Sequence, residues 1–237
     1  MVRSLTTSVA DAELRHEIAY TRQRDWFDPA ENPRAHVTIV GVGGIGSPTA
    51  LALAKLGIPK LTLIDPDIVE AHNLPNQMFP MGSVDDYKTS AVADTLEGFS
   101  PIEVETYEVE GQHAAVAYRD VVISGLDSME ARRDLWEQTL RRNIRVPLYL
   151  DARLGGENIV VYAVKPHDPD DIEFYETTLH SDEDSKPAPC TRQSIIDVGF
   201  IVAGLLTRAV RRHYAGEPSD RTTFIDWSNL TIMKGST

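Results

Sequence analysis

The chain contains a single cysteine, Cys190, among its 237 residues. One cysteine excludes a disulfide within the chain and any zinc site built from several cysteines, so we expect no zinc. Long hydrophobic runs are missing too, because the longest apolar stretch, Val198–Leu206, is far too short to cross a bilayer. The first residues lack the apolar core of a signal peptide. These absences predict a protein of the reducing cytoplasm with no membrane partner.

Positive charge is also scarce. The chain has 23 lysines and arginines against 36 aspartates and glutamates, which gives a formal net charge of −13. This balance argues against nucleic acid as a main partner, because a polyanion is bound through basic residues. Flexible linkers, low-complexity tracts and internal repeats are absent as well, and the chain is long enough for a full core. We therefore expect a single domain over residues 1–237.

What the chain does contain is a strand, a glycine-rich turn, a helix and a second strand within residues 36–67. The turn has the pattern G-x-G-G-x-G, formed by Gly41, Gly43, Gly44 and Gly46. Glycines let backbone N–H groups approach a phosphate at a helix N-terminus, where the helix dipole favours negative charge. Asp65 ends the second strand about 20 residues later, where a carboxylate can accept hydrogen bonds from ribose hydroxyls. The segment therefore predicts a nucleotide site.

Strands alternate with helices along the rest of the chain, which indicates an α/β fold. We expect a doubly wound, mostly parallel, Rossmann-like sheet with helices on both faces. Strands are predicted at 37–40, 61–64, 102–109, 121–124, 147–151, 158–164 and 222–227, and helices at 47–56, 87–96, 128–143 and 191–214.

Three segments of this single domain have a distinct character. An N-terminal arm covers 1–35 and is polar. An acidic loop with several prolines covers 165–189, and it is either a solvated excursion or a lid over a substrate groove. The helix at 191–214 is apolar on nearly every side over 195–206, which predicts burial in the core or at a subunit interface.

Short motifs surround the glycine turn. In chain order they are Tyr20-Thr-Arg22-Gln23, Asp65-Pro-Asp67, Asn73-Leu-Pro-Asn76-Gln77, Lys88 at a helix start, and Ser124-Gly-Leu-Asp127 after a strand. This set resembles the ThiF/MoeB/HesA-type family, which is related to the adenylation domains of ubiquitin-activating enzymes. The resemblance covers about residues 20–215. The combined spacing is far more specific than the glycine pattern, which dehydrogenases and methyltransferases also use.

The resemblance implies an ATP-dependent adenylyltransferase. Such an enzyme activates the C-terminal carboxylate of a ubiquitin-like or sulfur-carrier protein as an acyl-adenylate and releases pyrophosphate. The carrier would present a flexible C-terminal tail. The carboxylate attacks the α-phosphorus in line, and the developing charge needs cations and oriented donors rather than a strong base. A homodimer is also implied, because Arg22 resembles an arginine that such dimers supply from the partner subunit.

The resemblance also assigns roles to single residues. The nucleotide would be bound by Gly41, Gly43, Gly44, Gly46, Asp65, Asp67, Asn73, Asn76, Gln77 and Lys88. Asp65 would hold the ribose, Lys88 would contact the phosphates, and Asp127 would bind Mg²⁺. Arg22, Lys88, Asp127 and Cys190 are the candidate catalytic residues. These assigned residues also have structural alternatives. Asp65 could be a loop cap, Lys88 a surface lysine and Asp127 a helix N-cap.

Three departures from the family pattern stand out. Asn76 replaces an arginine, and an amide has neither the charge nor the bidentate fork of a guanidinium. Arg153, just past the end of a strand, is a candidate to compensate. The paired C-x-x-C segments that bind zinc in many relatives are absent. The D-x-x-D motif begins with Ser124, which leaves Asp127 as its only carboxylate.

Cys190 precedes the helix at 191–214, a place where some relatives carry the cysteine that receives the activated carrier as a thioester. A thiolate at a helix N-terminus is a better nucleophile because its pKa is depressed. The alternative is a half-buried thiol beside Thr191, which would be the helix N-cap.

Two other functions stay open. One is a pseudo-subunit or carrier-binding scaffold whose adenylation site is weakened at Asn76. The other is an NAD-dependent oxidoreductase, which rests on the glycine turn alone. The sequence does not identify the carrier or its pathway.

Overall fold

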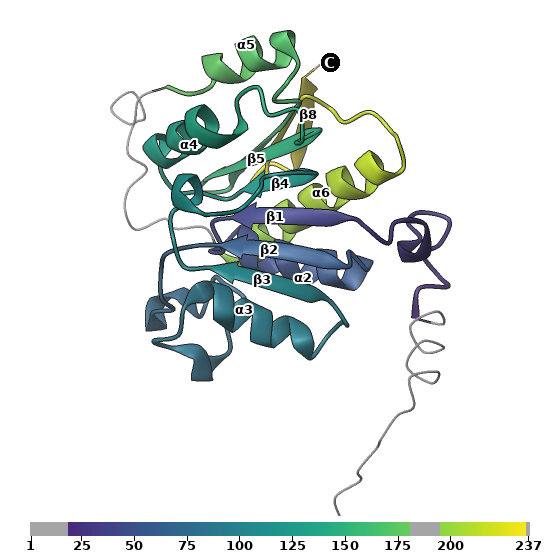
Figure 1. The fold of residues 1–237 in the computed structure, drawn as a ribbon. Helices are drawn as coiled ribbons and strands as arrows, with labels where there is room; N and C mark the ends of the chain where they lie inside the picture. Colours follow the sequence, from purple (N-terminus) through teal and green to yellow (C-terminus); the bar gives the residue numbers. More distant parts are fainter. Residues whose placement is uncertain (1–18, 181–194, 236–237) are drawn as a thin grey trace, which may run out of the picture.

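The computed structural model describes residues 19–180 and 195–235. These residues contain one eight-stranded sheet in the order β3-β2-β1-β4-β5-β6-β7-β8 (Figure 1). The first five strands in this order run parallel, with bounds β3 Glu103–Tyr107, β2 Lys60–Ile64, β1 His36–Val40, β4 Val121–Ser124 and β5 Leu148–Gly155. The last three, β6 Asn158–Val164, β7 Thr222–Asp226 and β8 Thr231–Gly235, continue antiparallel. The predicted doubly wound, mostly parallel α/β sheet is confirmed.

Helices cover both faces of the sheet (Figure 1). One face carries α2 (Gly46–Leu56), α3 (Lys88–Glu97) and α6 (Ile196–Tyr214). The other carries α4 (Met129–Leu135), which continues into a π-helical turn at Trp136–Leu140, and α5 (Pro169–Thr177). None of the helices in the described part of the chain is long and apolar enough to cross a membrane.

The alternation of apolar side chains along β1 explains how the sheet holds both helix layers. Val37 and Ile39 point into the core beneath α2, α3 and α6, whereas Val40 belongs to the core beneath α4 and α5. The second core is built around three rings. Trp136 stacks against Tyr149 at 5.9 Å between ring centroids, and Tyr175 lies 4.6 Å from Trp136.

The predicted loop at 165–189 is wrong over 169–177, where the structure has α5. The prolines and acids that suggested a loop are helix-start signals here. Asp168 is the N-cap and its carboxylate accepts from the N–H groups of Asp170 and Asp171, while Pro169 occupies the first helical turn. Residues 181–189 of the predicted loop lie outside the described residues.

The predicted helix at 191–214 is described from Ile196, and its expected burial holds for one face within the chain. Val198, Val202 and Leu206 are buried, but Phe200 is 52% exposed. Apolar composition around a helix therefore does not by itself place every side in a core. The strand β8 was not predicted from the sequence. It pairs with β7 and forms the edge of the sheet.

Trp136 provides a test of this packing. Replacing Trp136 with alanine removes the centre of the aromatic core, so we expect the free energy of unfolding to fall by about 3–5 kcal/mol. Trp26→Ala is the matched control, because Trp26 is mostly exposed and contacts Arg211 at the surface; its effect should stay within about 1 kcal/mol. Urea unfolding measures both, and equal losses would contradict this description of the core.

Candidate functional site

A cleft lies where the order of the parallel strands reverses. β2 and β3 lie on one side of β1, and β4 and β5 lie on the other. Ligands of such sheets bind in the crevice outside the carboxyl ends of the strands at this point. The cleft here has a volume of about 620 Å³, within the usual range for small-molecule sites. Its walls come from the loops that follow β1 to β4, and they include Gly41, Gly43, Gly44, Asp65, Asp67, Gln77, Lys88 and Asp127.

Close backbone contacts hold the glycine turn in place. Gly41 has a φ of +86°, in the left-handed region that favours glycine. A Cβ at Gly41 would lie 2.8 Å from the carbonyl oxygen of Gly125, and a Cβ at Gly46 would lie closer than 3.0 Å to the carbonyl oxygen of Gly41. The turn after β1 therefore contacts the start of α2 and the loop after β4 through backbone atoms at Gly41, and the Ile45 side chain packs against Gly125. Gly46 itself lies behind the turn, packed on Gly41, and does not line the cleft.

Asp65 braces the same turn from the end of β2. Its Oδ2 accepts a hydrogen bond from the Val42 N–H at 2.6 Å, and its Oδ1 accepts from the Asp67 N–H at 2.9 Å. Burial raises the pKa of Asp65 above its ordinary value, although the two N–H groups and the nearby Lys88 ammonium oppose that shift. Asp65 therefore caps the loop, which is the structural alternative that the sequence offered for it. A hydrogen bond from Asp65 to a ribose stays a prediction.

Lys88 is the first residue of α3 and is not a surface lysine. Its side chain is 11% exposed, and its Nζ lies 2.7 Å from Oδ2 of Asp67, whose side chain is 63% exposed. Among the described residues that line the cleft, Lys88 is the only lysine or arginine. The ion pair holds the ammonium at the cleft wall, where it can reach an anion.

Of the polar residues at 73–77, Asn73 stabilises a turn and Gln77 lines the cleft. Asn73 caps a short turn, since its Oδ1 accepts from the Glu70 N–H at 2.9 Å, and neither Asn73 nor Asn76 is among the described residues lining the cleft. Gln77 does line it and lies against Gly43. Its Oε1 is buried and has no hydrogen-bond partner within the described part of the chain. A buried acceptor without a donor fits a ligand that donates a hydrogen bond.

Asp127 is exposed in the cleft, on the loop after β4. The N-cap of α4 is Ser128, whose Oγ accepts from the Ala131 N–H at 3.1 Å, so the interpretation of Asp127 as that cap was wrong. Among the described residues, no group of three or more histidine, cysteine, aspartate or glutamate side chains could hold a metal ion. A Mg²⁺ ion bound by Asp127 would complete its coordination with water and with oxygens of a bound phosphate.

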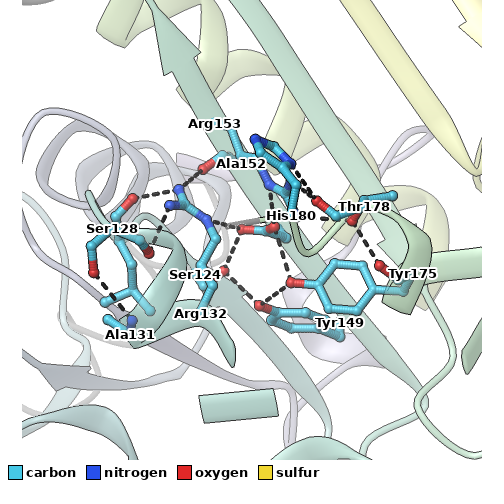
Figure 2. Close-up of polar contacts among 12 residues, drawn as sticks. Ser124, Ser128, Ala131, Arg132, Tyr149, Ala152, Arg153, Tyr175, Thr178 and His180 are labelled. Carbon is cyan, nitrogen blue, oxygen red and sulfur yellow. Dashed lines mark hydrogen bonds and ion pairs between the residues drawn. The ribbon is translucent and has the colours of Figure 1, made fainter. Parts of the chain in front are cut away.

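Behind this loop lies a buried polar network that the sequence did not predict. Asp151, on β5, is fully buried, and its Oδ1 accepts from Ser124 Oγ at 2.8 Å and Arg132 Nε at 3.0 Å. Its Oδ2 accepts from Arg153 Nε at 2.7 Å and Tyr175 Oη at 3.0 Å. Figure 2 shows its four partners, Arg132 of α4, Ser124 of β4, Arg153 of β5 and Tyr175 of α5, directed towards one another.

The charges of two neighbouring arginines set the pKa of Asp151. Burial opposes its ionisation, but the Arg132 and Arg153 guanidiniums outweigh that effect and hold the pKa of the carboxyl below its ordinary value. The same contacts exclude Arg153 as the compensator for Asn76. Its guanidinium donates to Asp151 and to Thr178, lies 4.7 Å from the Tyr162 ring centroid, and does not line the cleft.

One predicted catalytic residue, Arg22, is not brought to the cleft of its own chain. Arg22 is exposed on the N-terminal arm, and its neighbour Gln23 donates to the Leu56 carbonyl at the end of α2. That end of α2 is opposite to the glycine turn, so Arg22 does not reach the cleft of its own chain. Cys190 and Thr191 lie outside the described residues.

Comparison with known proteins agrees with this geometry. The model of the ThiF family matches residues 30–231. The chain belongs to the ThiF family. It is 31% identical over 171 residues to the molybdopterin-synthase adenylyltransferase of Haemophilus influenzae, covering 66% of this chain and 70% of that protein. It is 34% identical over 154 residues to the sulfur carrier protein ThiS adenylyltransferase of Escherichia coli, covering 62% and 59%.

Other ThiF-related proteins are longer or more distant. The rice ubiquitin-like modifier-activating enzyme 5 is 28% identical over 153 residues, covering 55% of this chain and 36% of that protein. The chain thus spans about a third of the length of that relative. The crystal structures of PaaA and of E. coli MccB with ATP have the same fold, each with a TM-score of 0.70. Their identities are 19% and 20%, and they cover 99% and 98% of this chain and 86% and 79% of those chains.

The glycine contacts can be tested by adding one methyl group. Gly46→Ala places a Cβ against the Gly41 carbonyl, and because both atoms belong to packed backbone, we expect a loss of about 1–3 kcal/mol in unfolding free energy. Gly82→Ala is the matched control, since nothing lies within 4 Å of its Cβ position, and its effect should stay within about 0.5 kcal/mol. Urea unfolding decides, and a stable Gly46→Ala variant would show that the turn is not tightly packed.

The pKa of Asp151 predicts how pH changes the effect of Arg153→Gln. A carboxyl with a lowered pKa stabilises the fold above its ordinary value of 3.8 and loses that contribution as the pH falls below it. The variant lacks, at every pH, the part of this contribution that comes from Arg153, while Arg132 remains paired with Asp151. We expect it to be about 1–3 kcal/mol less stable than wild type at pH 7, with a deficit that shrinks as the pH falls below about 4.

Urea unfolding between pH 7 and the lowest pH at which both proteins fold measures this deficit. Arg133→Gln is the control, because Arg133 donates to the backbone carbonyls of Leu179 and His180 and, among the described residues, forms no ion pair with a carboxylate. Its deficit should not vary with pH. A pH-independent deficit for Arg153→Gln would contradict the charge assignment.

Proposed function

We propose that this chain adenylates the C-terminal carboxylate of a ubiquitin-like or sulfur-carrier protein with ATP and releases pyrophosphate. The observation that carries the proposal is the cleft, where Lys88 and Asp127 line the same cavity as the glycine turn of a ThiF-family chain. Its relatives support the choice of substrate, since those with printed activities are adenylyltransferases or activating enzymes for such carriers.

The groups in the cleft suit a nucleotide. The N–H groups of the turn and the N-terminus of α2 would face the phosphates. Lys88 would neutralise phosphate charge, and Gln77 Oε1 would accept a hydrogen bond from the nucleotide. Asp127 would hold Mg²⁺, which spreads the negative charge of the phosphate oxygens. Asp67 holds Lys88 in place and is better suited to that task than to contact with the nucleotide.

A homodimer completes this proposal. Arg22 lies away from the cleft of its own chain, and an arginine supplied by a second copy would add the positive charge that Asn76 does not provide. The carrier would enter with a flexible C-terminal tail. We keep Cys190 as the candidate thiol for a subsequent thioester. We also propose a cytoplasmic location and no requirement for zinc, on the basis of the single cysteine.

A carrier-binding scaffold is the second candidate function, and Asn76 is the observation that favours it. The oxidoreductase alternative gains nothing from the described cleft, because its walls offer a lysine suited to a phosphate and a carboxylate suited to a metal ion rather than an acid or base set beside a nicotinamide.

Carrier-dependent ATP–pyrophosphate exchange tests the function. Asp127→Ala should reduce the exchange rate by roughly 100-fold or more, because Mg²⁺ loses its carboxylate ligand and no longer neutralises the charge on the phosphates. Asp94→Ala is the matched control, since Asp94 is exposed on α3 outside the cleft, and it should exchange at the wild-type rate. Ubiquitin-like proteins encoded near this gene are the carriers to assay. A carrier that binds but supports no exchange would favour the scaffold.

A further inference from the structure

We propose that Arg132 is a positioning residue, which fixes Asp127 in the cleft by binding the backbone on both sides of it. The proposal rests on the proposed function, because it gives the Asp127 carboxylate a task towards the metal–nucleotide complex. Arg132 does not line the cleft and would touch neither nucleotide nor carrier.

The hydrogen bonds of Arg132 carry this inference. Its guanidinium donates to the carbonyl oxygens of Leu126 and, at 3.2 Å, of Ser128, which are the two residues next to Asp127 in the chain. It also donates to the Ala152 carbonyl at 3.0 Å (Figure 2). One planar, buried group therefore connects both flanks of Asp127 to the neighbouring strand β5.

The guanidinium is itself held by the sheet. Its Nε donates to Asp151 Oδ1, and the same carboxylate is fixed on its other side by Arg153 and Tyr175. Ser124, the last residue of β4, donates to that Oδ1 as well. The Asp127 loop is thus positioned relative to β4 and β5 through one carboxylate that is fully buried.

Stability alone gives a weaker account of this arrangement. A buried ion pair is often no more stabilising than apolar side chains of the same volume. What a guanidinium adds is a rigid fork that can bind several carbonyls in fixed directions. Within this loop Gly125 has no side chain and Asp127 is exposed, so side-chain packing next to Asp127 comes from Leu126, which lies against the core beneath α4 and α5. Partners that orient a metal ligand commonly change metal affinity by roughly 10–100-fold when removed.

The test compares Arg132→Lys with Arg133→Lys in the full chain. Both changes keep the charge, and both original side chains donate to backbone carbonyls from α4, but Arg133 binds Leu179 and His180 and not the Asp127 loop. One readout is amide hydrogen exchange over residues 125–129 without nucleotide. The other is the Mg²⁺ concentration that gives half-maximal binding of a non-hydrolysable ATP analogue, measured by calorimetry.

For Arg132→Lys we expect exchange over 125–129 to accelerate and the Mg²⁺ midpoint to rise, each by roughly tenfold. The analogue's affinity at saturating Mg²⁺ should change much less, and Arg133→Lys should match wild type in both readouts. If Arg132→Lys does not fold, Ser124→Ala, which loosens the same Asp151 oxygen, should shift both readouts in the same direction by a smaller factor.

Three results would overturn the proposal. The first is a destabilised Arg132→Lys protein in which neither the amide hydrogen exchange over residues 125–129 nor the Mg²⁺ midpoint changes. The others are equal shifts of both readouts in Arg133→Lys, and binding of the ATP analogue by the wild type that does not depend on Mg²⁺. Failure of the proposed function is distinguishable from these. A wild-type protein that binds Mg²⁺ and nucleotide but catalyses no ATP–pyrophosphate exchange with any carrier refutes adenylation. The amide hydrogen exchange and the Mg²⁺ midpoint still decide the role of Arg132.

Discussion

The described cleft depends on direct contact between three stretches of backbone. Gly41, in the turn after β1, approaches the Gly125 carbonyl of the loop after β4, and Gly46, the first residue of α2, approaches the Gly41 carbonyl, at distances that leave no room for a Cβ at either glycine. This approach points the N-terminus of α2 at the crevice and brings the Asp127 loop to the same place. Gly199 on α6 packs against the Gly44 carbonyl in the same manner, so the long helix also supports the turn.

Such a turn needs support, because glycine provides flexibility and no side-chain packing. Two buried carboxylates provide it from β2 and β5, which lie on opposite sides of the β1–β4 pair in the sheet. Asp65 binds N–H groups of the turn and of its own loop, and Asp151 acts through Arg132 on the carbonyls beside Asp127. One carboxylate therefore orients donors and the other orients acceptors, and both are held by the ends of parallel strands.

The sequence predicted the parts of this arrangement that are local in the chain. Apolar runs located β1, β2 and β4, and the glycines with Lys88 and Asp127 indicated where a nucleotide would lie. The Arg132–Asp151–Arg153 network was not predictable, because it joins residues of separate elements that only the sheet order brings together. Helix α5 was missed for a different reason, since proline and aspartate favour both loops and helix starts, and only the cap contacts distinguish the two.

The charge of the cleft decides how a nucleotide could bind. Besides Asp67 and Asp127, the described walls include Glu110, Glu130 and Asp134, against one lysine that is already paired. A polyphosphate placed there meets more negative than positive charge, so its binding needs counter-charge from outside these walls. A divalent cation bound with the phosphates supplies part of it, and Asp127 is placed to share that cation. Within the described part of the chain, neither Arg22 nor Arg153 supplies the rest, because Arg22 lies at the far end of α2 and Arg153 is bound to Asp151; in the proposed homodimer an arginine of the second copy would do so.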